Sequence, residues 1–172
     1  MRYLFLCLFS LLLAAACSDD DQLSPVDQLP PATQTGENIV ACLIDAEPWV
    51  NDPNRTGEVN ISATYYQTQN VVQMIAFSGE YGTNSGSVLS LIISPPLVGT
   101  TVLDSMSIRR TLMPQTQDEV EYFLRSNTGT IEVTHLDINA RIISGIFNGA
   151  LISTTGLDTI NVTDGRFDVT FY

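Results

Sequence analysis

Residue types suited to nucleophilic and general-base chemistry are rare in this chain, which has a single histidine, His135, and three cysteines, among them Cys42. The period of two places His135 on the same face as Ile131 and Val133, and Cys42 lies within the apolar run 39–44. Such positions are typical of core or rim residues, and no third group in the sequence is placed to orient the histidine. A Cys42–His135 catalytic dyad is the alternative. One histidine and one apolar-flanked cysteine are too few ligands for a zinc site of the usual type.

Carboxylates are the second group of candidate catalytic residues, because the chain contains 19 aspartates and glutamates. A glycosidase needs two of them about 5–10 Å apart. The acids that a fold could bring together are Asp118, Glu119, Glu121, Asp137, Asp158, Asp164 and Asp168. Solvated strand ends and turns explain the same residues, and we favour this interpretation. Motifs of nucleophile elbows, zinc proteases and phosphate-binding loops are absent as well, so the sequence predicts no catalytic residue, no cofactor and no metal site.

Aromatic side chains would serve a different chemistry, because an exposed ring offers a flat apolar platform to a sugar. The candidate ligand contacts of this kind are Trp49, Tyr65, Tyr66 and Tyr81. Trp49 follows Pro48 near the start of the fold, and for this residue we favour a place in the core. Exposure of these rings together would indicate a carbohydrate-binding surface.

The elements that position these side chains are expected to be β-strands, because apolar and polar residues alternate with a period of two after residue 36. The pair Asp164-Gly165, between two alternating segments, is typical of a hairpin turn. Roughly eight to ten strands joined by short turns predict an all-β fold, an antiparallel meander that forms a β-sandwich or a flattened barrel. The last segment places Phe167, Val169 and Phe171 on one face, and we expect it to close the core.

The N-terminus has the features of a secretory signal peptide. Arg2 supplies a positive charge, residues 3–13 form an almost unbroken apolar run, and three alanines precede Cys17. Small residues before a cysteine resemble a bacterial lipobox, in which the cysteine becomes the acylated N-terminus. The sequence therefore predicts that Cys17 carries palmitate or a similar fatty acid. Ordinary cleavage after an Ala-x-Ala site, which would leave Cys17 as a thiol, is the alternative.

Residues 17–35 are expected to form a disordered acidic tether, because an Asp-Asp-Asp run and several prolines prevent regular structure there. The predicted organisation is a signal peptide at 1–16, the acylated cysteine and tether at 17–35, and a single β domain at 36–172. Acidic residues directly after the acylated cysteine resemble the surface-export signal of Bacteroidota lipoproteins. They indicate the outer membrane with the domain at the cell surface; its periplasmic face is the alternative.

Composition excludes several classes of protein. A chain of 172 residues suits one domain and is short for two. Its net charge of −12 repels phosphate backbones, so we expect no nucleic-acid partner. Of the three cysteines, one leaves with the signal peptide and one is acylated, so no intramolecular disulfide is expected and the fold depends on its apolar core.

The two ends of the mature chain carry a family resemblance. Residues 29–38 read Leu-Pro-Pro-Ala-Thr-Gln-Thr-Gly-Glu-Asn, followed by Ala-Cys-Leu-Ile-Asp at 41–45 and by Trp49. Near the other end lie Ile-Ser-Gly-Ile-Phe at 143–147 and Val-Thr-Asp-Gly-Arg-Phe-Asp-Val at 162–169. Together they resemble a group of Bacteroidota lipoproteins of unassigned function. The resemblance covers essentially the mature chain and implies no catalytic residues.

Two short matches predict a modification. Asp104-Ser105-Met106 and Asp158-Thr159-Ile160 resemble the Asp-Ser/Thr-apolar sites at which Bacteroidota O-glycosylate exported proteins. Ser105 and Thr159 are therefore candidates for O-glycosylation.

These observations lead us to expect a membrane-anchored lipoprotein that acts as a binding or structural module without catalysis, with an unidentified glycan or protein as partner. A carbohydrate-binding accessory of a glycan-uptake system is the first alternative and would require exposed coplanar aromatic rings. An acid/base hydrolase is the second and would require two carboxylates that face each other in one cleft.

Overall fold

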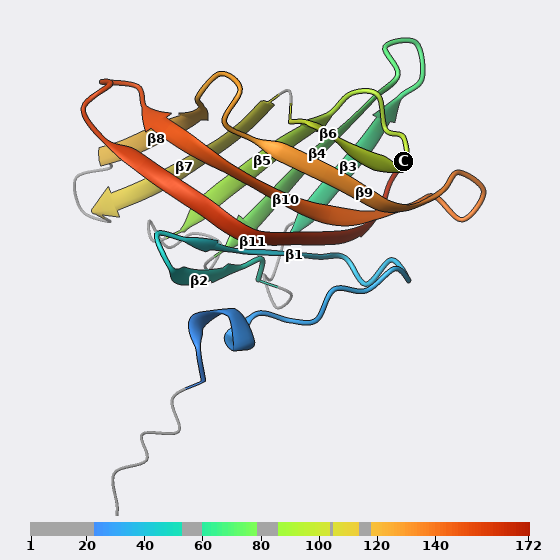
Figure 1. Cartoon of the computed structure of the whole chain (residues 1–172), viewed down its shortest axis with the longest axis horizontal. Helices are drawn as coiled ribbons and strands as arrows, with labels where there is room; N and C mark the ends of the chain where they lie inside the picture. The colour runs from blue at the N-terminus through green and yellow to red at the C-terminus, as the bar shows by residue number, and fades with distance from the viewer. Residues whose placement is uncertain (1–22, 53–59, 79–85, 104, 114–117) are drawn as a thin grey trace, which may run out of the picture.

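The computed structural model of the protein describes residues 23–52, 60–78, 86–103, 105–113 and 118–172. Within these ranges it contains eleven β-strands, one short 3₁₀ helix and no α-helix, and every strand pair is antiparallel (Figure 1). The all-β prediction is confirmed. No helix in the described part of the chain is long and apolar enough to cross a membrane.

The elements follow in chain order. They are η1 (Pro25–Gln28), β1 (Ile39–Ile44), β2 (Glu47–Val50), β3 (Ile61–Tyr66), β4 (Val71–Ser78), β5 (Ser87–Ile93), β6 (Gly99–Val102), β7 (Ser105–Met113), β8 (Asp118–Leu124), β9 (Thr130–Asp137), β10 (Ile142–Ser153) and β11 (Thr159–Thr170).

The strands form one curled sheet in the order β2-β1-β11-β10-β8-β7-β5-β4-β3, with β9 and β6 attached beside β10. This branch exists because β10 is twelve residues long. Residues 142–148 of β10 pair with β9, whereas residues 151–153 pair with β8. In Figure 1 the strands β6, β9, β10 and β11 therefore form a front layer, with β3, β4 and β5 behind them.

The curl closes at the C-terminal residue. The backbone N–H of Tyr65 donates to the carbonyl of Tyr172 at 2.8 Å, and the N–H of Tyr172 donates to the carbonyl of Ala63 at 3.0 Å. The edge strand β3 is thereby bonded to the end of the chain just after β11. The result is consistent with the predicted flattened barrel, and it leaves this part of β3 without an open edge.

Alternate residues of the strands fill the interior. Val40, Cys42 and Ile44 of β1 point inward, and Phe167, Val169 and Phe171 lie in the same core, as the alternation predicts. Trp49 is buried there as well. Side chains of the opposite parity lie on the outer face of the sheet, where they are available for other contacts.

The prediction of a hairpin turn at Asp164-Gly165 is wrong. Residues 159–170 form one continuous strand, β11, which pairs with β1 on one side and β10 on the other. The register shifts between Phe147 and Gly149 and between Ala41 and Leu43, and Asp164 has a φ of 52°. A left-handed residue followed by glycine provides a β-bulge as readily as a turn. Here the neighbouring strands continue on both sides of the pair, so the chain stays extended.

The prediction of a disordered tether up to Thr35 is wrong for the described residues from 23 onward. We call residues 23–38 the N-terminal strap. Its short helix η1 precedes Leu29, which is buried with Ala41 and Leu43 in a small second core on the outer face of β1, beside the half-buried Val50. The strap then runs along the outside of the sheet in an extended conformation (Figure 1). Its order comes from these apolar contacts and from hydrogen bonds to β11, described below.

Two glycine–phenylalanine pairs lie opposite each other on the inner face of β10 and β11. Gly145 is in register with Phe167, and Phe147 is in register with Gly165. A Cβ on Gly145 would lie 2.2 Å from the carbonyl oxygen of Glu132 and 2.7 Å from the Phe167 ring. Each ring therefore occupies the space that a side chain opposite it would fill, which is why these strand positions are glycine.

Substituting Gly145 by Ala is expected to lower the free energy of unfolding by about 3 kcal/mol or more, because the new methyl group would overlap a backbone carbonyl that cannot rotate away. Gly156→Ala is the control. Gly156 has a φ of +73° and no neighbouring atom within 4 Å of an added Cβ, so only the left-handed backbone penalty of about 1–2 kcal/mol applies. Urea denaturation measures both losses, and an equal or smaller loss for Gly145→Ala would contradict the packing argument.

Candidate functional site

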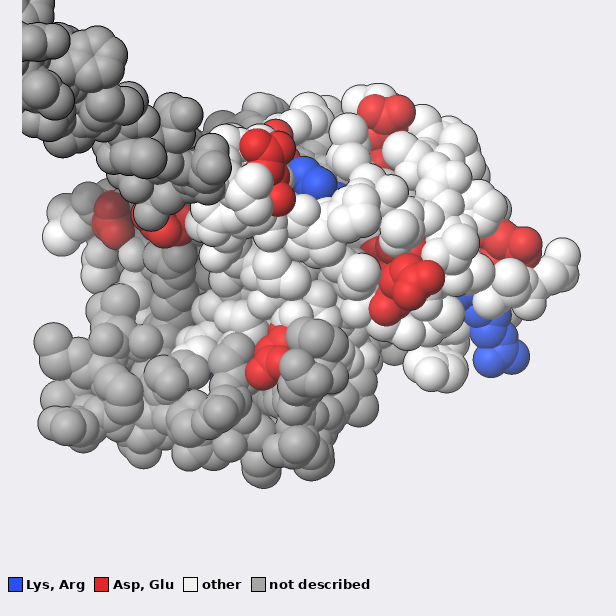
Figure 2. Space-filling model, turned by 90° about the horizontal axis from the view of Figure 1, so that it is seen from below, with Lys and Arg blue, Asp and Glu red and all other residues white. Residues whose placement is uncertain are grey.

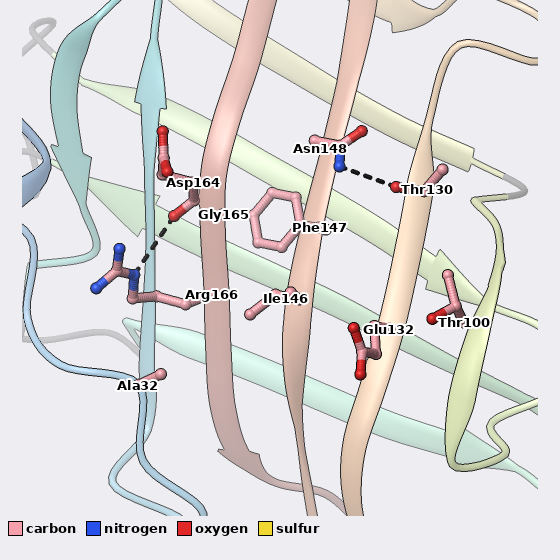
Figure 3. Close-up of a pocket in the computed structure, with 10 residues that line it drawn as sticks. All are labelled: Ala32, Thr100, Thr130, Glu132, Ile146, Phe147, Asn148, Asp164, Gly165 and Arg166. Carbon is pink, nitrogen blue, oxygen red and sulfur yellow. Dashed lines mark hydrogen bonds between the residues drawn. The ribbon is translucent and has the colours of Figure 1, made fainter.

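The front layer carries a groove on its outer face, which we call the outer groove. The strand registers place one residue from each of four neighbouring strands in a row across it: Arg166, Ile146, Glu132 and Thr100. A second row places Asn148 next to Thr130. The groove has a volume of about 530 Å³ (Figure 3), which lies within the range of small-ligand sites.

The floor of the outer groove is apolar at its centre. Ile146 lies between the inward-facing residues Gly145 and Phe147, so strand alternation directs its side chain outward. Its side chain is 45% exposed. Burying an exposed aliphatic side chain is favourable, so the floor offers a ligand an apolar contact at this point.

Polar groups surround this floor. The Asn148 side chain donates a hydrogen bond from Nδ2 to Oγ1 of Thr130 at 2.8 Å, which leaves the Asn148 Oδ1 atom and the Thr130 hydroxyl hydrogen for other partners. The Glu132 carboxylate forms no hydrogen bond with another residue that lines the groove (Figure 3). The groove thus presents a carboxylate, an amide and hydroxyl groups on a rigid sheet.

One wall of the groove is the N-terminal strap, and Arg166 joins the two. Its guanidinium donates from Nη1 to the carbonyl of Pro30 at 2.9 Å and from Nε to the carbonyl of Asp164 at 3.4 Å. In Figure 3 the guanidinium points toward the strap, near Ala32, and away from Glu132. Arg166 therefore serves mainly to attach the wall, and the centre of the groove is left to Ile146, Glu132 and Asn148.

The strap itself is held by the buried carboxylate of Asp168. Oδ1 accepts hydrogen bonds from the Ser144 hydroxyl at 2.7 Å and from the Gly36 N–H at 2.9 Å. Oδ2 accepts from the Thr33 hydroxyl at 2.7 Å and from the N–H groups of Thr35 and Glu37 at 3.0 and 3.1 Å. Successive backbone N–H groups that converge on one anion form a nest. Gly36 makes the nest geometry accessible because its φ is +78°.

Two further bonds extend the attachment along β11. Asn38, with a φ of 58°, accepts hydrogen bonds at its Oδ1 atom from the backbone N–H and the hydroxyl of Thr170. Arg166, Asp168 and Thr170 alternate along the strand, so all three side chains lie on its outer face. The strap is therefore attached to β11 at every second residue from Arg166 to Thr170.

The pKa of Asp168 lies below its ordinary value of 3.8. Burial acts to raise it, since desolvation disfavours the charged form, but the hydrogen bonds from Thr33, Ser144, Glu37 and Gly36 outweigh that effect. Asp168 is thus an ionised, buried group whose charge is stabilised by the strap. Among the acids predicted from the sequence, Asp168 therefore has a structural role, since its carboxylate holds the strap.

The structure does not form the Cys42–His135 dyad. Cys42 lies in the core on β1, and β11 and β10 separate β1 from β9, which carries His135. Three strand spacings correspond to about 14 Å. A bulge at Thr134 also places His135 in register with Ser144, whose side chain lies on the outer face. The expectation that His135 shares the apolar face of Ile131 and Val133 is therefore wrong.

The other predicted acids are dispersed. Asp137 accepts hydrogen bonds from Asn139 and Ala140 in a turn, and Asp158 accepts one from the Tyr122 hydroxyl at 2.7 Å. Asp164 and Glu132 both line the outer groove, but Figure 3 shows the Asp164 side chain directed toward β1, away from Glu132. These two carboxylates do not face each other. The side chains of Asp118 and Glu119 lie outside the described residues, and Glu121 is half-buried on β8.

The candidate aromatic contacts do not form a platform among the described residues. Trp49 is buried, and its indole N–H donates to the Ser87 hydroxyl. Tyr65 packs edge-on against Phe171 at 5.8 Å between ring centroids. Tyr66 is 42% exposed, and Tyr81 lies outside the described residues. A carbohydrate site built on these rings is therefore not what the fold presents.

The candidate modification sites differ in exposure. Thr159 is exposed at the start of β11, and Ser105 is half-buried at the start of β7. Cys17 and Asp104 lie outside the described residues. O-glycosylation of Ser105 and Thr159 and acylation of Cys17 stay predictions.

Acidic side chains are more prominent than basic ones on the described surface. Figure 2 shows acidic side chains scattered among uncharged ones, with basic side chains taking up little of this face. Such a surface disfavours anionic ligands in general. The outer groove follows the same pattern, since its carboxylates are Glu132 and Asp164 and its guanidinium is already bonded to backbone carbonyls.

Comparison with protein-family models, with curated proteins and with solved structures gives no match for this chain. The candidate site therefore stands on its geometry. Sequence reasoning missed Glu132, Asn148 and Ile146, because their proximity depends on the register between β9 and β10. It named Asp168 only as an acid. The available signal was the Thr-x-Thr-Gly segment at 33–36, whose hydroxyl and backbone N–H groups can donate hydrogen bonds to a carboxylate.

Replacing Asp168 by Asn is expected to lower the free energy of unfolding at pH 7 by about 2–4 kcal/mol, since hydrogen bonds to a buried charge are lost or inverted. Because folding lowers the pKa of Asp168 from its ordinary value of 3.8, its stabilisation is present above that value and is lost as the pH falls through the folded value. The difference between parent and variant should therefore be constant above about pH 5 and shrink below about pH 4.

Denaturant titrations across this pH range check the prediction. Asp27→Asn is the matched control, because Asp27 is an exposed acid in the same strap. A parent-to-variant difference for Asp168→Asn that does not change at low pH would show that the side chain acts by shape alone.

Proposed function

We propose that the chain is a membrane-anchored lipoprotein whose β domain is a non-catalytic binding module, with the outer groove as its ligand site. The observation that carries the proposal is the row of Arg166, Ile146, Glu132 and Thr100 across four hydrogen-bonded strands. Side chains on paired strands are held by the backbone ladder, so they need little rearrangement to meet a ligand. An apolar centre surrounded by polar groups is typical of small-molecule sites.

The structure supports a binding role more than a catalytic one. A hydrolase of the acid/base type needs a facing pair of carboxylates, and Glu132 and Asp164 point in different directions (Figure 3). Groups of three or more potential metal ligands are absent from the described residues. The proposal therefore assigns to the groove recognition without bond cleavage.

The lipid anchor completes the proposal. The Ala-Ala-Ala-Cys junction favours acylation of Cys17, and the acidic residues after it favour the surface of the outer membrane. The strap is attached to the sheet from Leu29 onward, so at most residues 18–28 lie between the acylated cysteine and the first attached residue. Fully extended, such a segment reaches about 40 Å. The domain would then be held closer to the membrane than a free tether ending at residue 35 would allow.

Changing Cys17 to Ser is expected to release the protein from membranes into the soluble fraction, because several acyl chains are needed for firm anchoring and all would be attached through this residue. Cell fractionation with fatty-acid labelling measures the effect. Cys42→Ala, which removes the core cysteine, should stay labelled and membrane-bound. Membrane retention of Cys17→Ser together with an unlabelled parent protein would contradict the anchor.

Filling the groove tests the ligand site. Ile146→Trp places a large side chain on the floor, at an exposed position where the fold should tolerate it. Ile138→Trp is the matched control, since Ile138 is 52% exposed in the turn after β9 and does not line the groove. Screening a fragment library of neutral, cationic and anionic compounds by NMR should yield binders that Ile146→Trp weakens at least tenfold and Ile138→Trp does not.

The proposed function fails if no compound class produces shifts among the groove residues of the parent protein. It also fails if the binders found are unaffected by Ile146→Trp.

A further inference from the structure

We infer that the ligand of the outer groove is a neutral saccharide, with its hydroxyl groups bonded to Glu132, Asn148 and Thr130 and the C–H face of one ring over Ile146. This inference rests on the proposed function and names the ligand class for the same site. It does not use the aromatic residues first considered for sugar binding, of which Trp49 is buried and Tyr65 is packed against Phe171.

The backbone of the groove floor favours a ligand that is recognised by side chains. Residues 130–133 of β9 are paired with β10 on one side and β6 on the other, and residues 142–147 of β10 are paired with β9 and β11. Their backbone N–H and C=O groups are engaged in these ladders. An extended peptide gains most of its affinity from a strand edge with open backbone groups, and the segments of β9 and β10 in the floor, which are paired on both sides, do not offer one.

The polar groups of the groove match a polyol. A sugar hydroxyl is both a hydrogen-bond donor and an acceptor, so a site for neighbouring hydroxyls needs protein acceptors and donors close together. Glu132 supplies two acceptor oxygens, Asn148 supplies Oδ1, and the Thr130 hydroxyl can donate because its oxygen already accepts from Asn148 at 2.8 Å. Thr100, in register with Glu132 on the edge strand, adds a further hydroxyl. The Asn148–Thr130 bond also fixes the orientation of both side chains before a ligand arrives.

Charge disfavours the anionic alternatives. The groove contains the carboxylates of Glu132 and Asp164, and its guanidinium, on Arg166, is bonded to the carbonyls of Pro30 and Asp164 and points toward the strap (Figure 3). A nucleotide, a phosphorylated ligand or an acidic sugar would bring its charge next to Glu132. Two negative charges in contact repel each other, so we expect the groove to select uncharged sugars.

The apolar floor accounts for the remaining contact. A pyranose ring has one face of C–H groups, and Ile146 is an exposed aliphatic side chain between the polar groups of β9 and β11. Contact between them removes apolar surface from water without leaving a polar group unsatisfied. Because the floor is aliphatic and open, affinity should come from several sugar units that lie along the groove.

The experiment uses the folded parent protein and a panel of neutral oligosaccharides of glucose, xylose, mannose and galactose, titrated by NMR and calorimetry. At least one neutral oligosaccharide should bind, with shifts confined to the groove residues. Glu132→Ala, Asn148→Ala and Ile146→Trp should each weaken it at least tenfold. Glu47→Gln, which changes an exposed acid on the distant edge strand β2, should change the affinity by less than twofold.

Two further probes separate this inference from the proposed function. The oligosaccharide of the same linkage that carries a uronic acid should bind at least tenfold more weakly than the neutral one, and Glu132→Gln should narrow that gap. A basic peptide series tests the protein-partner alternative. If peptides or charged fragments bind at the groove and no neutral oligosaccharide does, the saccharide inference is overturned and the binding module stands. If no probe shifts the groove residues, both are overturned.

Discussion

A buried carboxylate is the constraint on which the rest of the outer surface depends. Asp168 is almost completely removed from solvent, and an ionised group in that position is costly unless it is fully hydrogen-bonded. Ser144 supplies one donor from the sheet, but the Thr33 hydroxyl and the N–H groups of residues 35–37 come from the strap. The sheet therefore cannot bury Asp168 favourably without the strap, and the strap in turn forms one wall of the outer groove. The ionised side chain of Asp168 thus links the N-terminal strap, β11 and the outer groove.

The strands beneath this surface show how closely the two faces are coupled. Gly145 and Gly165 leave room for Phe167 and Phe147 on the inner face, so the aromatic rings interlock across β10 and β11 only in one register. A slip by one residue would exchange the faces of a whole strand. The same register sets Ile146 beside Arg166 and Glu132 on the outer face. Packing inside the barrel thus determines which side chains meet in the groove.

The sequence was sufficient for the fold class, because a period of two is a local property that survives any arrangement of the strands. It was not sufficient where the same local pattern is compatible with two different backbone conformations. Asp164-Gly165 is compatible with a turn or a bulge, and the difference lies in β1 and β10, which pair across it. Residues 23–35 have the composition of a linker, and their order comes from Leu29 and from Asp168, more than 130 positions away. The groove required the registers of β6, β9, β10 and β11 together, which no local pattern contains.

The inner and outer faces of the sheet differ in how readily their residues can be substituted. Inner positions are filled to close packing, so substitutions there are expensive. Outer positions such as Ile146, Asn148 and Thr130 are exposed, and surface substitutions usually change stability by less than about 0.5 kcal/mol. Substitutions on the floor of the groove can therefore alter its chemistry without disturbing the sheet beneath it, whereas the wall cannot change independently of Asp168. Any ligand that contacts the wall near Ala32 also contacts the segment that leads to the predicted lipid anchor. In the proposed function, recognition is linked to membrane attachment through the strap, which is held against the sheet by Asp168, Leu29 and Asn38.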